Sequence, residues 1–191
     1  MKRLLTILSL CIVMTTSQAG ISKLKDLEGF RSTAYADGAP NGHQMFSIGY
    51  GHQIKAGETS LKTGKISVDT GVALMRSDIA PIEKTINSDL RVKPTQNQFD
   101  ALVLFGYNTP DGLNHVIATW NSTKDANKAT ANMLLYNKWH PSPGVLAVNP
   151  DLAKRRAAEI SLFNSTLAPA VKNSLLVAGA GLCVAFLVLR T

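Results

Sequence analysis

A stretch rich in Gly, Pro and Asn between residues 35 and 57 limits the folds that this chain of 191 residues can adopt. The segment before it, from 20 to about 34, carries Ile21, Leu24 and Leu27 at helical spacing. The stretch itself combines turn-forming residues with one strand-like run, "QMFSIGYGHQI", which predicts a small antiparallel sheet. From residue 67 onward the apolar pattern is helical. The sequence therefore predicts an α+β domain, in which a small β lobe and a mainly helical lobe flank a cleft.

The second part of the chain predicts four or more helices. Their sequences are "SVDTGVALMRSDIAPIEKTINSDL", "KPTQNQFDALVLFGYNT", "DANKATANMLLYNKW" and "DLAKRRAAEISLF". Pro81 lies inside the first of them and is expected to kink or divide it, because proline removes a backbone donor. The run "HPSPGVLAVNP" before the last helix is expected to be a loop.

Composition narrows the class of protein without naming a function. Hydrophobic residues make up 45% of the chain and charged residues 17%, so a core can form and wholesale disorder is disfavoured. The net charge of +7 favours polyanionic partners: nucleic acid, anionic lipid or anionic wall polymers. Cys11 and Cys183 both lie in apolar terminal segments, which excludes a disulfide within the central domain. The histidines show no metal-ligand spacing, so neither a metal nor a cofactor is expected.

The N-terminal sequence "MKRLLTILSLCIVMTTSQAG" resembles an export signal. Lys2 and Arg3 precede an apolar run of 11 residues, and small residues precede a possible cut between Ala19 and Gly20. Residues 1–19 are therefore predicted to be a signal peptide or an uncleaved signal-anchor. The folded domain is predicted to span residues 20–165.

The C-terminal sequence predicts a membrane anchor. Residues 174–189 carry no charge and lie between Lys172 and Arg190, after a linker at 166–173. As a helix this run would cover roughly 24 Å, close to the minimum for a span. A buried C-terminal helix is the alternative, but the run has no polar face. Positive charges at both ends of the chain place the central domain outside the cytoplasmic membrane.

Two carboxylates flank the start of the predicted sheet. Glu28 lies near the end of the first helix, and Asp37 lies nine positions later, in the β region. Hydrolysis of a glycosidic bond typically uses two carboxyl groups, one protonated and one ionised, in contrasting environments. A helix end and an adjacent β segment offer such a contrast. The spacing by itself is common by chance, so the surrounding motifs decide its meaning.

Those motifs resemble the phage-type, T4-like lysozymes of glycoside hydrolase family 24. The resemblance rests on "EGFRSTAYAD" followed by "SIGYGH", on "TQNQFDALVLFGYN", on Trp139 before the last loop, and on "RRAAEISLF". It covers roughly residues 20–165. It implies a lysozyme-like fold and a muramidase, which cuts the β-1,4 bond between N-acetylmuramic acid and N-acetylglucosamine in peptidoglycan.

The resemblance also implies residue roles. Glu28 would be the general acid, and Asp37 would hold the attacking water or stabilise positive charge on the sugar. Ser47 stands where the family carries a catalytic Thr, and nine residues separate it from Asp37, more than is usual in the family. Arg155 matches the Arg that pairs with the catalytic Glu, with Arg156 as the alternative.

Other candidates carry open alternatives. His52 is expected to be structural rather than catalytic, although it is kept as a possible cleft residue. Gln98 and Asn108 either line the cleft or serve as buried capping groups. Trp139 is expected in the core rather than as a platform on which a sugar stacks.

The resulting hypothesis is a membrane-tethered muramidase used by a phage for host lysis or cell penetration. Its partners would be peptidoglycan glycan strands and, through the C-terminal helix, a lipid membrane, with no nucleic acid. It would be located at the host inner membrane facing the periplasm, or in a virion membrane. The alternatives are a lytic transglycosylase on the same fold and a catalytically silent wall-binding membrane protein. The oligomeric state is left open.

Overall fold

The computed structural model describes residues 13–38, 43–142 and 144–165. The predicted linker and C-terminal anchor, and most of the predicted N-terminal signal, lie outside the described residues. Within the described part of the chain, none of the helices combines the length and apolar character needed to cross a membrane.

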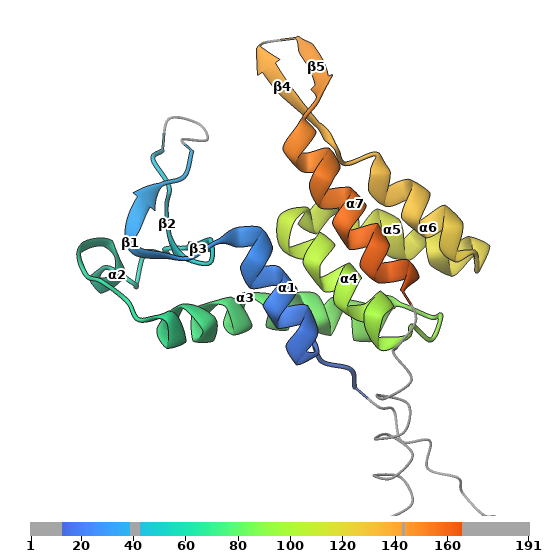
Figure 1. Ribbon diagram of the computed structural model, residues 1–191, viewed down its shortest axis with the longest axis horizontal. Coiled ribbons are helices and arrows are strands. Elements are labelled where there is room, and N and C mark those ends of the chain that lie inside the picture. Colours follow the sequence, from blue (N-terminus) through green and yellow to red (C-terminus); the bar gives the residue numbers. More distant parts are fainter. Residues whose placement is uncertain (1–12, 39–42, 143, 166–191) are drawn as a thin grey trace, which may run out of the picture.

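The chain folds into a β lobe and a helical lobe, as the sequence predicts (Figure 1). The N-terminal part contains α1 (Gln18–Glu28), β1 (Arg31–Ala36), β2 (Phe46–Gly49), β3 (His52–Gln53), α2 (Ser60–Thr63) and α3 (Val68–Asp89). The C-terminal part contains α4 (Gln96–Asn108), α5 (Pro110–Thr123), α6 (Ala126–Leu134), β4 (Lys138–Ser142), β5 (Val145–Val148) and α7 (Pro150–Asn164).

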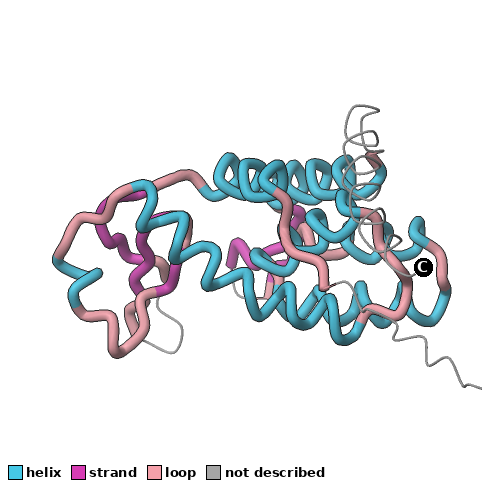
Figure 2. Tube along the Cα trace, turned by 90° about the horizontal axis from the view of Figure 1, so that it is seen from below, coloured by secondary structure: helices cyan, strands magenta, loops and turns pink. Residues whose placement is uncertain are grey.

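Strands β1, β2 and β3 form an antiparallel sheet in chain order, and β4 and β5 form a separate antiparallel hairpin. In Figure 2 a group of strands lies at one end of the molecule and the helices fill the other end. The hairpin of β4 and β5 replaces the predicted loop. Trp139 is paired with Ala147 there and is 49% exposed, so the expectation that it lies in the core was wrong.

The first helix begins at Gln18, so the predicted domain start at residue 20 falls inside it. It ends at Glu28, in agreement with the predicted position of Glu28 near its end, because Gly29 adopts a positive φ of 67° and turns the chain into β1.

Helix α3 continues across Pro81, so of the two expected outcomes, a kink or a division, the division is wrong. Proline removes one backbone donor, and the exposed position of Pro81 leaves the rest of this 22-residue helix intact.

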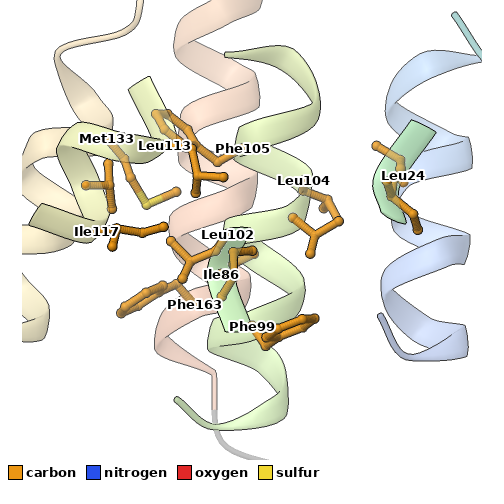
Figure 3. Packing of buried hydrophobic residues seen from close by; sticks show 14 of the residues in the cluster. Leu24, Ile86, Phe99, Leu102, Leu104, Phe105, Leu113, Ile117, Met133 and Phe163 are labelled. Atoms are coloured by element: carbon orange, nitrogen blue, oxygen red, sulfur yellow. The ribbon is translucent and has the colours of Figure 1, made fainter. Parts of the chain in front are cut away.

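The core forms around α4, whose residues 99–106 are all buried. Figure 3 shows Leu102 and Phe105 among side chains of the neighbouring helices, and Leu104 on the side of α4 that faces Leu24 of α1. Phe163 of α7 packs on Trp120 of α5, with ring centroids 5.0 Å apart. Each large apolar side chain buried in this way contributes roughly 1.5–3 kcal/mol.

Replacing Leu102, which is fully buried, by Ala is expected to reduce the free energy of unfolding by about 2–5 kcal/mol, because it leaves a cavity in the core. Denaturant unfolding followed by circular dichroism measures this loss. The matched control is Leu135→Ala. Leu135 is 66% exposed, so its change is expected to stay within about 0.5 kcal/mol.

Candidate active site

Glu28 is the last residue of α1, and its carboxylate lies near both α7 of the helical lobe and Gly51 of the β lobe. Its Oε1 accepts a hydrogen bond of 2.6 Å from Nη2 of Arg155 on α7. Its Oε2 lies beside Gly51: a Cβ built on this glycine would be 3.6 Å from that oxygen. Gly51 has a φ of 85°, which glycine adopts without strain. The turn between β2 and β3 therefore approaches the second oxygen of Glu28 closely.

Asp37 and Ser47 come together despite the long insert between them. The backbone N–H of Asp37 donates to the carbonyl of Met45, and the N–H of Met45 donates to the carbonyl of Gly38, so the chain is paired on both sides of the insert. Ser47 on β2 pairs with Tyr35 on β1 and is 1% exposed. Its hydroxyl donates to Oδ2 of Asp37 at 2.6 Å. The pairing of β1 with β2 therefore brings Ser47 within hydrogen-bond distance of Asp37, although nine residues separate them in the sequence.

Tyr35 lies near both carboxylates and was not singled out from the sequence. Burial raises the pKa of its hydroxyl, and the negative charges of Asp37 and Glu28 raise it further. The guanidinium of Arg31 lies 4.3 Å from the centre of its ring. Tyr35 is therefore a neutral phenol near both acids. Its position two residues before Asp37 in "AYAD" was the available signal.

A second tyrosine, Tyr107, joins the helical lobe to the β lobe through a hydrogen bond. The Tyr107 hydroxyl on α4 donates to the Tyr50 carbonyl at 2.9 Å. Burial raises the pKa of Tyr107, with Asp78 and Glu28 adding to the shift. Tyr107 and Gly51 both line a cavity of about 450 Å³ bounded by β3, α3, α4 and the start of α5. This cavity therefore adjoins the Glu28 carboxylate through Gly51.

Arg155 is shared between two carboxylates. Its Nη2 contacts Glu28, and its Nε donates to Oε1 of Glu159 at 3.0 Å. Arg156, the alternative partner of Glu28, instead donates to Glu159 at 2.8 Å and to Asn108 at 2.9 Å. The side chains of Arg156 and Glu159 are both fully buried.

Glu159 is a functional candidate that the sequence reasoning missed, although it lies within the "RRAAE" motif. Burial raises the pKa of Glu159 to about 7, in spite of the two adjacent guanidinium groups. Both arginines contact Oε1, and the buried Oε2 has no partner among the described residues. Arg155 contacts both carboxylates. When Glu159 is ionised, its negative charge therefore offsets part of the positive charge of Arg155 that acts on Glu28.

The remaining candidates support the fold around the site. His52 is 2% exposed, and its ring nitrogens lie 2.8 Å from Asp78 and 3.0 Å from Glu58, which ties β3 to α3. The Lys55 backbone N–H and His52 lower the pKa of Glu58. Gln98 forms a capping box with Thr95 at the start of α4.

His52 thus links β3 to α3, and the half-buried Gln98 caps α4. Asn108 serves as a partner of Arg156 rather than as part of the cavity lining. Among the described residues there is no group of three or more His, Cys, Asp or Glu side chains that could hold a metal ion.

The sequence pattern of the family described as Phage lysozyme matches residues 25–159, which include Glu28, Asp37, Ser47, Arg155 and Glu159. The chain belongs to the phage lysozyme family. The family match spans both lobes and the helix that carries Arg155, so the site lies wholly within it.

The relatives of this phage lysozyme differ in length. The endolysin of Salmonella phage P22 is 31% identical over 158 residues, covering 80% of this chain and 100% of that protein. The endolysin of Bacillus phage PZA is 34% identical over 152 residues, covering 80% of this chain. The chain spans only 56% of the PZA protein's length.

Solved structures agree with the fold. The muramidase domain of SpmX from Asticaccaulis excentricus has a TM-score of 0.69 and 30% identity, covering 80% of this chain and 99% of that one. A variant of P22 lysozyme has a TM-score of 0.64 and 30% identity, again covering 80% of this chain and 99% of that one. These likenesses bear out the predicted lysozyme-like α+β architecture.

Replacing Glu159 by Gln is expected to flatten the pH dependence of stability. Below about pH 4.5 both folded and unfolded states hold the proton, so Glu159 adds no slope there. Between pH 4.5 and about 7 the unfolded chain loses this proton while the folded protein keeps it, so the folded state loses stability as pH rises. The variant should gain on the order of 1–3 kcal/mol relative to the parent across this window.

Denaturant unfolding at pH 4.5 and at pH 7.5 measures the effect of Glu159→Gln. Asp151→Asn, an exposed change in the first turn of the same helix, is the control. If the variant and the parent differ by the same free energy at both pH values, the raised pKa of Glu159 is refuted.

Proposed function

We propose that this chain is a T4-like muramidase of glycoside hydrolase family 24. It would hydrolyse the β-1,4 bond between N-acetylmuramic acid and N-acetylglucosamine in peptidoglycan. The observation that carries the proposal is the pair of carboxylates in contrasting settings: Glu28 on a helix end held by Arg155, and Asp37 at the end of a strand held by Ser47.

In this proposal Glu28 protonates the leaving oxygen. Its Oε1 is occupied by Arg155, so Oε2, on the side of Gly51, is the oxygen that carries the proton. The side chain of Glu28 is 17% exposed, so its carboxylate is partly shielded from water.

Asp37 is exposed and accepts the Ser47 hydroxyl, which leaves its other oxygen able to hold a water. A hydroxyl that donates to Asp37 still has lone pairs that accept a hydrogen bond. This arrangement supports hydrolysis over the transglycosylase alternative, since a transglycosylase requires no second group to position water. It also supports catalysis over a silent wall-binding role.

We also propose that the domain is tethered to a membrane and acts outside the cytoplasm during host lysis or cell penetration. Gln96 donates to the carbonyl of Thr15 at 2.9 Å, and the adjacent Asn97 donates to the carbonyl of Ser165 at 3.2 Å. The segments that lead to the two apolar ends of the chain therefore leave the domain side by side, at the first turn of α4. Both terminal segments would then be able to reach the same bilayer.

The change Glu28→Gln is expected to abolish clearing of peptidoglycan, because the amide cannot protonate the leaving oxygen. The loss should be on the order of a hundredfold or more. A zymogram against purified cell walls measures it. The control is Asp26→Asn, an exposed change on the same helix, which should clear like the parent. Clearing by Glu28→Gln at the parental rate would remove Glu28 from the mechanism.

Mass spectrometry of the released muropeptides separates the two reactions. Hydrolysis by water held at Asp37 and Ser47 yields free reducing ends on N-acetylmuramic acid. Products that carry 1,6-anhydro ends would show that the attacking group is an internal sugar hydroxyl, and the hydrolase proposal would then be wrong.

A further inference from the structure

The four residues before α1 are bound into the helical lobe by hydrogen bonds. The backbone of Met14 exchanges two bonds with the side chain of Asn87, at 2.9 and 2.8 Å. The backbone N–H and the hydroxyl of Thr16 both donate to Oε1 of Glu83, at 2.7 and 2.6 Å. Glu83 and Asn87 are on α3, so residues 14–17, which we name the N-terminal clamp, attach to that helix before α1 begins.

The clamp attaches to α4 through a buried carboxylate. Asp100 is 1% exposed and accepts both the backbone N–H of Ser17, at 2.9 Å, and the Ser17 hydroxyl. The Ser17 side chain in turn caps α1 by accepting the N–H of Gly20. A Cβ on Gly20 would lie 2.8 Å from Asp100, so only glycine lets α1 pass this close. The charge of Asp100 at the N-terminus of α1 also suits the helix dipole.

The same helix ends in Glu28. Its 11 residues span roughly 16 Å, so the clamp fixes one end and the Arg155 contact holds the other. Because Asp100 is on α4, and Arg155 is on α7, which packs along α4, both ends of α1 are set against the same part of the helical lobe. A shift at the clamp would move Glu28 relative to Arg155 and to Gly51.

We propose that residues 14–17 are a positioning clamp for Glu28, and that the active protein retains them, so its Ala19–Gly20 bond stays intact. The positioning role rests on the proposed catalytic function of Glu28. The retention of residues 14–17 rests on the contacts alone.

A cut after Ala19 would have a specific structural cost. It would divide α1 after its second residue and remove the Ser17 cap. It would also leave the buried Asp100 without the two donors that Ser17 supplies. Asp100 would keep the Gln96 side-chain amide as a donor. A buried carboxylate that loses two of its hydrogen-bond donors is destabilising, and a lost N-cap adds to that penalty. Any processing of the N-terminal apolar segment therefore has to occur before Met14.

The first experiment identifies the N-terminus of the exported protein. The full chain is produced in a bacterium that exports it, and the N-terminal peptide of the active material is determined by mass spectrometry. We expect a peptide that begins at or before Met14 and contains an intact Ala19–Gly20 bond. Fully active protein that begins at Gly20 would overturn the proposal.

The second experiment tests positioning in the full chain. Ser17→Ala is expected to lower kcat on the order of tenfold or more, with KM nearly unchanged, at a temperature where the variant is fully folded. Ser17→Thr keeps the capping oxygen and should recover most of kcat. Lys23→Ala, an exposed change on α1, is the control. A stability loss in Ser17→Ala at parental kcat would leave the clamp purely structural and refute the positioning role.

The outcomes separate the two proposals. If the parent clears no peptidoglycan, the proposed function fails, and the N-terminal peptide alone decides whether the clamp is retained. If the parent clears the wall and Ser17→Ala clears it equally well, the positioning role fails while the function stands.

Discussion

The burial of α4 on all sides is the constraint on which the rest of the structure depends. Eight consecutive residues, 99–106, are buried, so α1, α3, α5 and α7 must all pack around this one helix. A helix without an exposed face in its middle cannot shift without opening the core. Contacts with α4 therefore position the groups of the site. Asp100 accepts a hydrogen bond from Ser17 at the start of α1, and the carbonyl of Leu104 accepts one from Arg155.

Charge in the site is organised around a single guanidinium. Arg155 contacts Glu28 at the boundary of the lobes and Glu159 inside the helical lobe. A guanidinium has five donors in a fixed plane, so it can hold both carboxylates at once. The buried partner has its pKa raised to about 7, and Glu28 keeps limited contact with solvent. One arginine therefore contacts both the carboxylate at the boundary of the lobes and the buried carboxylate of Glu159.

Several features could be predicted because they depend on local sequence. Glu28 at the end of a helix follows from the glycine after it, and the pairing of Arg155 with Glu28 follows from the family motif. The hairpin of β4 and β5, in contrast, cannot be predicted in this way, because prolines and a glycine interrupt the strand pattern of "HPSPGVLAVNP". The sequence predicts Trp139 in the core, whereas its strand lies on a hairpin that projects from the helices (Figure 1).

The sequence by itself determined the order of the two lobes, and it predicted the two acids of the candidate site, because helical periodicity, turn residues and motifs are local. Only the tertiary structure decided that Ser47 reaches Asp37 across the long insert, since strand register depends on pairing with β1. It also decided that Glu159 shares Arg155, and that residues 14–17 belong to the folded domain. Ser47 and Asp37 meet through the pairing of β1 with β2. The contacts of residues 14–17 with α3 and α4, and of Arg155 with Glu28, join residues far apart in the sequence, and packing around α4 brings these together.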